Sequence, residues 1–346
     1  MQASVASMGR SVIALRNNKK NLASGNADML SDLLGLLTMT HLLRQALLTT
    51  LLASGLSAVA LAPAYADGIK KVSISGSAPM DYLLYDANAT ETYVNPSASL
   101  QSILSGNAAS PTGNVELAAS SEKAGFDFSK STTLNGTIGG RAIAISSLTQ
   151  SDWDTAAYKG STKTFGKYWF DQALTSNGFG ALASSSMGTS LFNIFKTNGG
   201  FQRFSDPNLS YVNQTTTGDV QIGLAGHLNA TPLFTKSIDQ YLSSSSTLKN
   251  SEKLMLGAMK TQLSSKAIQA SEVFKYTYNG LSDYGYSFQA TASGLTERGD
   301  KISHTGNYEV VLAGPPPIKH VPEPGVLLSL AGVAAAGWKR RKSKSV

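Results

Sequence analysis

Three histidines stand beyond residue 66, and they are the first candidates for chemistry. His227 follows a glycine at the expected end of a strand, His304 lies in an expected polar turn, and His320 lies in a proline-rich stretch. None has a second histidine or an acid at the spacing of a zinc site, and the chain has no cysteine, so no metal site is predicted. His227 or His304 could join a serine and an aspartate in a hydrolytic triad, but serine is too abundant here for that pattern to indicate a site.

A pair of aspartates at the start of a predicted helix resembles a glycosidase pair. Asp152 and Asp154 flank a tryptophan, but residues two apart do not share a helix face. The run from Thr149 to Asp152 fits a capping box, which assigns Asp152 to the helix start. We expect this helix to end at Gly160. The two aspartates are therefore interpreted as capping residues.

Other catalytic and ligand-binding motifs are incomplete or missing. Asp86, Asn88 and Thr90 have the spacing of the first three ligands of a calcium loop, without the glycine and the acid that complete it. Asp206-Pro207-Asn208 is first of all a turn and only second a candidate ligand site. There is no nucleophile elbow, no phosphate-binding loop and no dinucleotide fingerprint. The sequence thus predicts no catalytic residue, no metal and no cofactor.

Aromatic residues alternate in two neighbouring runs, over 274–278 and 284–288. If the five residues between them form the loop of a hairpin, Tyr278 pairs with Tyr284 and Tyr276 with Tyr286, and all six rings share one face. In the plainer interpretation that face closes a core. In the alternative it is exposed, and Tyr276, Tyr278, Tyr284 and Tyr286 are candidates for stacking on sugar rings.

The elements that would position these residues are mostly short strands. Alternating patterns predict strands at 72–74, 133–137, 141–145 and 220–224. Helices are expected at 149–160, 167–176 and 190–196 and within 236–269, where Leu256, Met259 and Leu263 share one face. Residues 86–125 are expected to form loops or a loosely packed extension. The fold class predicted is α+β, strand-rich, with a mainly antiparallel sheet and a few helices.

The charge of the chain is concentrated at its two ends. The formal net charge is +7, yet residues 67–319 hold 19 basic and 19 acidic side chains. A protein that binds nucleic acid is expected to carry excess basic residues on its folded body, and this body has none in excess. No nucleic-acid partner is therefore predicted.

The N-terminal region contains the pattern of a secretory signal peptide over residues 39–66. A short basic start precedes the apolar run from Ala46 to Leu61, and Ala64 and Ala66 form a small-x-small site before Asp67. Cleavage by signal peptidase is expected between Ala66 and Asp67. Residues 1–38 do not fit this pattern, and we interpret them as a mis-assigned or extended N-terminal region.

The C-terminal region orders three features from residue 321 onward. Pro322, Glu323 and Pro324 come first, an apolar run over 325–338 follows, and a basic cluster ends it, formed by Lys339, Arg340, Arg341 and Lys342. The run is expected to form a single short transmembrane helix, and the basic cluster to stop transfer and stay in the cytoplasm. Residues 314–320 precede it as a proline-rich spacer.

This tail resembles the PEP-CTERM sorting signal of proteins exported by Gram-negative bacteria. The resemblance covers residues 321–346 and implies recognition by an exosortase in the inner membrane, which cuts near Pro-Glu-Pro and passes the body to the cell surface or matrix. It also associates the protein with exopolysaccharide and biofilm.

The function expected from the sequence is that of a non-enzymatic structural or binding protein. The body, residues 67–313, would be anchored briefly in the inner membrane, cut, and delivered to the cell surface or outside it, with exopolysaccharide as a candidate partner. The alternative is a secreted hydrolase acting on polysaccharide or peptide. A cleft with two carboxyl groups about 5–9.5 Å apart and of shifted pKa would favour the glycosidase form of this alternative, and a body without such a cleft would favour the binding protein.

Overall fold

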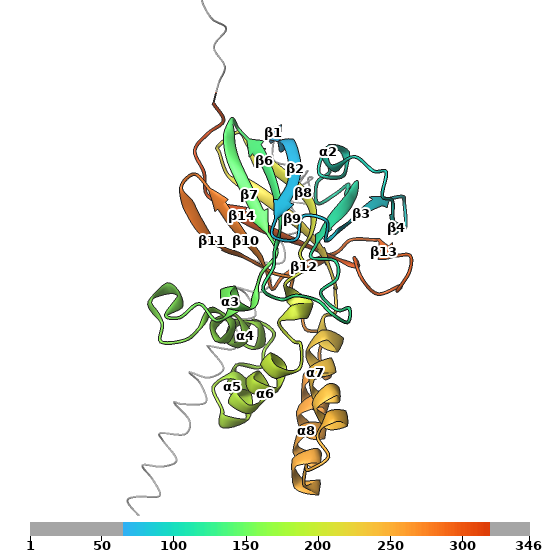
Figure 1. Ribbon diagram of the computed structural model, residues 1–346, viewed down its shortest axis with the longest axis vertical. Coiled ribbons are helices and arrows are strands. Elements are labelled where there is room, and N and C mark those ends of the chain that lie inside the picture. Colours follow the sequence, from blue (N-terminus) through green and yellow to red (C-terminus); the bar gives the residue numbers. More distant parts are fainter. Residues whose placement is uncertain (1–64, 319–346) are drawn as a thin grey trace, which may run out of the picture. The chain divides into compact units, whose positions relative to one another are not determined.

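A computed structural model describes residues 65–318 (Figure 1). The expectations for residues 1–38, for most of the signal peptide, for the sorting motif at 322–324, for the C-terminal helix and for the basic cluster lie outside these residues. No helix within 65–318 is both long enough and apolar enough to cross a membrane.

Two sheets form most of the body. The larger follows the order β12-β14-β9-β8-β5-β3-β4-β13, with β1 paired to β8, and the smaller the order β11-β10-β7-β6-β2. Every pairing given is antiparallel except that of β13 with β4. The strands of the larger sheet are β1 (Tyr65–Gly68), β3 (Tyr82–Ala87), β4 (Glu91–Val94), β5 (Gly113–Leu117), β8 (Asn208–Thr215), β9 (Val220–Gly226), β12 (Ala290–Ala292), β13 (Thr296–Glu297) and β14 (Gly306–Leu312). Those of the smaller sheet are β2 (Lys70–Gly76), β6 (Thr132–Ile138), β7 (Arg141–Ser146), β10 (Phe274–Tyr278) and β11 (Leu281–Gly285).

One hydrophobic core lies between the two sheets. Alternation along each strand places one set of apolar side chains inward. Val115, Leu209 and Ile222 from the larger sheet pack with Leu134 and Ile145 from the smaller, and all five are fully buried. The body is therefore a two-sheet sandwich over this part of the chain.

A second core belongs to the helices and is rich in aromatic rings. Trp169 packs against Phe204 and Phe234, with ring centroids 4.9 and 6.0 Å away, and Phe195 lies 5.3 Å from Phe234. Helices α3 to α8 gather at one end of the sheets (Figure 1). The helices are α2 (Leu100–Ile103), α3 (Gln150–Trp153), α4 (Phe165–Ser176), α5 (Gly180–Ala183), α6 (Ser186–Thr197), α7 (Thr231–Ser244) and α8 (Asn250–Leu263), with 3₁₀ turns η1 (Tyr158–Gly160) and η2 (Gln202–Phe204).

The predicted fold class, mixed α+β with largely antiparallel sheets, is confirmed. The capping box is also present, since the Thr149 N–H donates to Asp152 Oδ2 at 2.9 Å, although the helix ends at Trp153 and a 3₁₀ turn follows. Leu256, Met259 and Leu263 are the buried face of α8, as the pattern predicts.

The expectation of loops or a loosely packed extension over residues 86–125 is wrong. This stretch contains β4, α2 and β5, and Val115 and Leu117 have no exposed surface. The error has a physical reason. The elements are only four or five residues long, and the two strands are stabilised by pairing with β3 and β8 and not by local propensity.

The register predicted for the aromatic hairpin is wrong as well. Tyr278 pairs with Leu281 and Tyr276 with Asp283, so the loop has two residues and not five. Asn279 and Gly280 have φ of 50° and 77°, the left-handed conformation that a tight two-residue hairpin turn needs. The shorter turn shifts the register.

Both described ends of the chain meet at one end of the sandwich. Asp67 and Gly68 of β1 pair with Gln214 and Asn213 of β8, so a cut after Ala66 would leave these two pairings. Gln214 Nε2 donates to the Pro315 carbonyl at 3.1 Å, and Ile318 N–H donates to the Gly139 carbonyl at 3.0 Å. The first part of the proline-rich spacer is thus hydrogen-bonded to the body.

We expect Phe234→Ala to destabilise the body by about 3–5 kcal/mol, because it leaves a cavity in the aromatic core. Phe234 is 1% exposed. Chemical denaturation measures the effect, with Met80→Ala as control, since Met80 is 82% exposed. Equal stability of the two variants would contradict the packing described.

Candidate functional site

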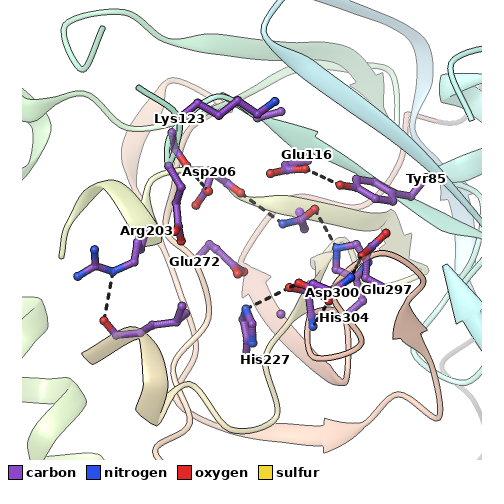
Figure 2. Close-up of a pocket in the computed structure, with 18 residues that line it drawn as sticks. Tyr85, Glu116, Lys123, Arg203, Asp206, His227, Glu272, Glu297, Asp300 and His304 are labelled. Carbon is purple, nitrogen blue, oxygen red and sulfur yellow. Dashed lines mark hydrogen bonds between the residues drawn. The ribbon is translucent and has the colours of Figure 1, made fainter. Parts of the chain in front are cut away.

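A cavity of about 250 Å³ lies where strands β5, β8, β9 and β14 begin or end (Figure 2). We call it the acid pocket, because carboxyl groups dominate its ionisable lining. Six acidic side chains and two basic ones line it: Glu116, Glu122, Asp206, Glu272, Glu297 and Asp300, with Lys123 and Arg203. Two histidines, His227 and His304, and Tyr85 are the other ionisable groups of this lining.

Glu116 reaches the acid pocket from β5, where it pairs with Asn208 of β8. Its Oε2 accepts a hydrogen bond of 2.9 Å from the Tyr85 hydroxyl. Burial and the charge of Asp206 raise the pKa of Glu116 to about 8, although the bond from Tyr85 acts in the opposite direction. Glu116 therefore keeps its proton at neutral pH.

Asp206 stands between η2 and β8, in the segment interpreted as a turn. Its Oδ2 accepts a hydrogen bond of 2.5 Å from Ser121, whereas its Oδ1 is buried without any partner. The residue as a whole keeps some exposed surface. Burial, with a smaller contribution from Glu122, raises the pKa of Asp206 to about 7, so this carboxyl changes charge near neutral pH.

Glu272 comes from the connection between α8 and β10, and its backbone is held on both sides. Ser271 N–H donates to the Ser287 carbonyl at 2.9 Å and Val273 N–H to the Phe204 carbonyl at 2.8 Å. The Glu272 side chain is 6% exposed, and its Oε2 has no hydrogen-bond partner. A Cβ at Gly226 would lie 3.1 Å from this oxygen, so the glycine at the end of β9 leaves room for the carboxyl.

The three carboxyl groups influence one another. Burial raises the pKa of Glu272 well above its usual value, and the charges of Asp206 and Glu116 add to the shift. Asp206 is also the largest charge effect on the pKa of Glu116. Ionising one of the three therefore makes ionisation of the others more difficult.

His304 is held as a neutral imidazole by a buried network. Its Nδ1 lies 2.6 Å from Thr92 Oγ1 and 3.3 Å from Asn114 Nδ2, and its Nε2 lies 3.3 Å from Asn208 Oδ1. An Nε2–H tautomer satisfies all three contacts. Burial lowers the pKa of His304 to about 4. His304 lies in a turn, as the sequence predicts, but this turn is buried and the residue is 3% exposed.

Ser303, His227 and Asp300 also meet at the acid pocket. Ser303 Oγ lies 3.3 Å from His227 Nε2 and donates to Asp300 Oδ2. A hydrolytic triad places the histidine between the acid and the serine. Here the serine lies in the middle and gives its proton to the acid, so the group lacks the arrangement that activates a nucleophile.

The basic residues of the lining are directed to other partners or act at a distance. The Arg203 guanidinium donates to the carbonyls of Leu233 and Asn198, both at 3.2 Å, and to Ser237 Oγ. Lys123 acts on Glu116 through its charge. Neither Asp206 Oδ1 nor Glu272 Oε2 receives a donor from them. Two residues that line the acid pocket therefore each carry a buried carboxyl oxygen without a donor.

Glu116, Glu272 and His304 supply hydrogen-bonding groups that are uncharged at neutral pH, whereas hydrogen bonds from Ser303 lower the pKa of Asp300 and keep it ionised. Protonated carboxyls and a neutral imidazole both donate and accept hydrogen bonds, which suits the hydroxyl groups of a small polar molecule. A carboxyl of raised pKa can also act as a general acid. Over residues 65–318 no group of three or more His, Cys, Asp or Glu side chains could hold a metal ion.

The four tyrosines proposed for sugar stacking are separated by the structure. Tyr276 and Tyr278 pack with the sheet core, whereas Tyr284 and Tyr286 pack with the helical core. Tyr278 is 2% exposed, and the Tyr284 ring stacks on Phe165 with centroids 4.0 Å apart. The single row of rings on which that expectation depends is absent from the described hairpin.

Neither residue of the aspartate pair lines the acid pocket. Asp152 accepts from Thr149 and forms an ion pair of 2.9 Å with Lys275, which agrees with its interpretation as a capping residue. The expectation for Asp154 is wrong, because α3 ends at Trp153 and Asp154 follows its last turn, where it pairs with Lys196 at 2.5 Å.

Sequence reasoning missed Glu116, Asp206 and Glu272, which lie 90 and 66 residues apart along the chain. No spacing connects them. The one local indication is Glu272 within the otherwise uncharged run from Ala267 to Phe274, where an isolated acid in an apolar context invites attention.

Comparison with protein-family models, with curated proteins and with solved structures finds no match for this chain.

The raised pKa values predict that the body loses stability as pH rises from 6.5 to 8.5. In this range the unfolded chain has ionised its carboxyls, whereas the folded chain still holds protons on Glu116 and Glu272. Each retained proton contributes a slope of about 1.4 kcal/mol per pH unit. The histidines, whose pKa is lowered, have their effect below this range. Denaturation at several pH values measures the slope.

Glu272→Gln removes one titrating group and should flatten that slope by about one such step. Asp127→Asn is the matched control. Hydrogen bonds from Ser129 lower the pKa of exposed Asp127, so it stays ionised throughout. A wild-type stability that rises between pH 6.5 and 8.5 would show that the pocket carboxyls are not protonated.

Proposed function

We propose that this chain is an exported protein whose body binds a small, hydroxyl-rich ligand, of the saccharide class, in the acid pocket. The observation that carries the binding role is the pair of buried carboxyl oxygens, on Asp206 and Glu272, that have no donor. Buried polar atoms in folded proteins nearly always have a partner. A ligand hydroxyl would supply one to each.

The acid pocket also has a suitable size and chemistry for that ligand. Its volume of about 250 Å³ corresponds to roughly eight waters at ~30 Å³ each, which is the scale of one sugar ring. Hydrogen-bonding groups come from strands β3, β5, β8 and β13 and from the connections next to them, so they surround a ligand from several directions. A binding role in a cell-surface or matrix protein agrees with an exopolysaccharide partner.

The export part of the proposal rests on the sequence. The signal peptide at 39–66 and the tail at 321–346 support secretion, brief anchoring in the inner membrane and cutting by an exosortase, with delivery to the cell surface or outside. The hydrogen bonds from residues 315–318 to the body support a border between body and tail close to residue 318.

A second candidate is the hydrolase alternative, in its glycosidase form. The observation that favours it is the spread of carboxyl pKa values in one cavity, with Asp206 at about 7 and Glu272 well above its usual value. Protonated Glu272 could give its proton to a leaving oxygen while ionised Asp206 takes one from water. We place the non-enzymatic role first, because it requires only the two carboxyl oxygens without donors, whereas glycosidase chemistry also requires the two carboxyl groups to flank a glycosidic bond.

Binding is tested by ligand-observed NMR with a neutral hexose, a uronic acid and an amino sugar. Ala119→Phe adds bulk to the lining without changing its charge, and we expect it to weaken binding at least tenfold. Ala124→Phe is the control, because Ala124 is exposed and outside the lining. Unchanged binding by Ala119→Phe would place the ligand elsewhere.

The same samples separate the two candidates. Release of nitrophenol from nitrophenyl glycosides, lost about 10²–10⁴-fold in Glu272→Gln, would establish acid catalysis. Binding without any release supports the non-enzymatic role.

Export is tested by replacing Pro322, Glu323 and Pro324 with alanine. The full-length form should then accumulate uncut in the inner membrane, because the apolar run still inserts but the motif is gone. Neutralising Lys339 to Lys342 should instead let more chain pass through. Fractionation with mass spectrometry of the termini measures both. Normal shortening of the triple variant would exclude an exosortase.

A further inference from the structure

The acid pocket has an excess of acidic groups that the body does not balance. Two of its acids have a cation nearby. Glu122 forms an ion pair with Lys236. The charge of Arg203 acts on Asp206, although the Arg203 guanidinium donates its hydrogen bonds to α7 and to Asn198. Glu272 has no ion-pair partner among the described residues. Burying unpaired acids costs free energy.

Two buried oxygens define the position that lacks a cation. Asp206 Oδ1 and Glu272 Oε2 are both enclosed and both without donors, and each carboxyl raises the other's cost of ionisation, since the charge of Asp206 acts on Glu272. A single hydroxyl of a neutral sugar gives one donor and no charge. An ammonium group gives three donors and a positive charge, which stabilises the carboxyls in their ionised form.

From this geometry we infer that the ligand of the acid pocket carries a primary ammonium group, held between Asp206 and Glu272, on a small hydroxyl-rich molecule such as an amino sugar. The inference rests on the proposed binding function and names its ligand class. A metal ion is a poorer occupant, because residues 65–318 contain no group of three or more ligands for one.

Binding of an ammonium group should be coupled to loss of protons from the acid pocket. The other carboxyls that line the acid pocket are Glu116 from β5, Glu122 from the loop after it, Glu297 from the end of β13 and Asp300 from the connection before β14. The other ionisable neighbours are Lys123, Arg203, His227, His304, Tyr85 and Tyr308. Both histidines have lowered pKa values, through burial. Asp206, with a pKa of about 7, is therefore the group that titrates in the useful range.

The experiment is isothermal titration calorimetry of the purified body with glucosamine and with glucose, at pH 5 and pH 7. We expect glucosamine to bind at least tenfold more tightly than glucose at pH 7. Its affinity should fall about tenfold per pH unit below the pKa of Asp206 for each proton released. Repeating the titration in buffers of different ionisation enthalpy counts those protons.

Glu272→Gln keeps the shape of the side chain but removes its charge. It should abolish the preference for glucosamine, whereas Asp127→Asn, an exposed and distant site, should keep it. Asp206→Asn serves as the second variant if Glu272→Gln does not fold, and it should also remove the pH dependence.

Each outcome decides the inference. A preference for glucosamine that is lost in the pocket variants supports it. Equal binding of glucose and glucosamine overturns the ammonium inference but leaves the saccharide-binding function intact. Absence of binding by glucosamine at both pH values also overturns it, and the NMR panel with Ala119→Phe then decides the binding function separately.

Discussion

Removal of water from carboxyl groups is the physical constraint that shapes the site of this body. Glu272 Oε2 and Asp206 Oδ1 are both buried, and neither oxygen accepts a hydrogen bond. In water such groups would be ionised at neutral pH. In the fold their pKa values rise, because the charged form loses its solvation and meets a like charge. Burying these carboxyl groups destabilises the folded state, and packing in the two hydrophobic cores offsets that cost.

The position of the acid pocket follows from how these cores are joined. The chain passes from one core to the other at the start of β10. Val273 packs in the helical core, and its N–H donates to the Phe204 carbonyl. Phe274, one residue later, packs in the sheet core. Glu272, one residue before Val273, is thereby fixed at the border between them. The aromatic helical core therefore does more than stabilise: it holds the backbone that carries the least solvated acid.

The candidate site could be predicted from the sequence only in part. Local patterns gave the capping role of Asp152 correctly, because a capping box depends on four consecutive residues. His227 was placed correctly at the end of a strand for the same reason. Asp206 and His304 were interpreted as turn residues, and the turn is real in the sense that each stands next to a strand end. The burial of His304 depends on its contacts with Thr92 of β4, Asn114 of β5 and Asn208 of β8, all of which are distant from it in sequence.

The sequence by itself determined the strand-rich α+β class, the helix faces and the neutral charge of the body, since each follows from short-range periodicity or composition. It also carries the export pattern at the two ends. Only the tertiary structure decided the hairpin register, where two residues with positive φ replaced a five-residue loop. Only the tertiary structure brought Glu116, Asp206 and Glu272 together. Packing between segments that are distant in sequence holds these three acids in one cavity, and no local sequence pattern predicts that they are neighbours.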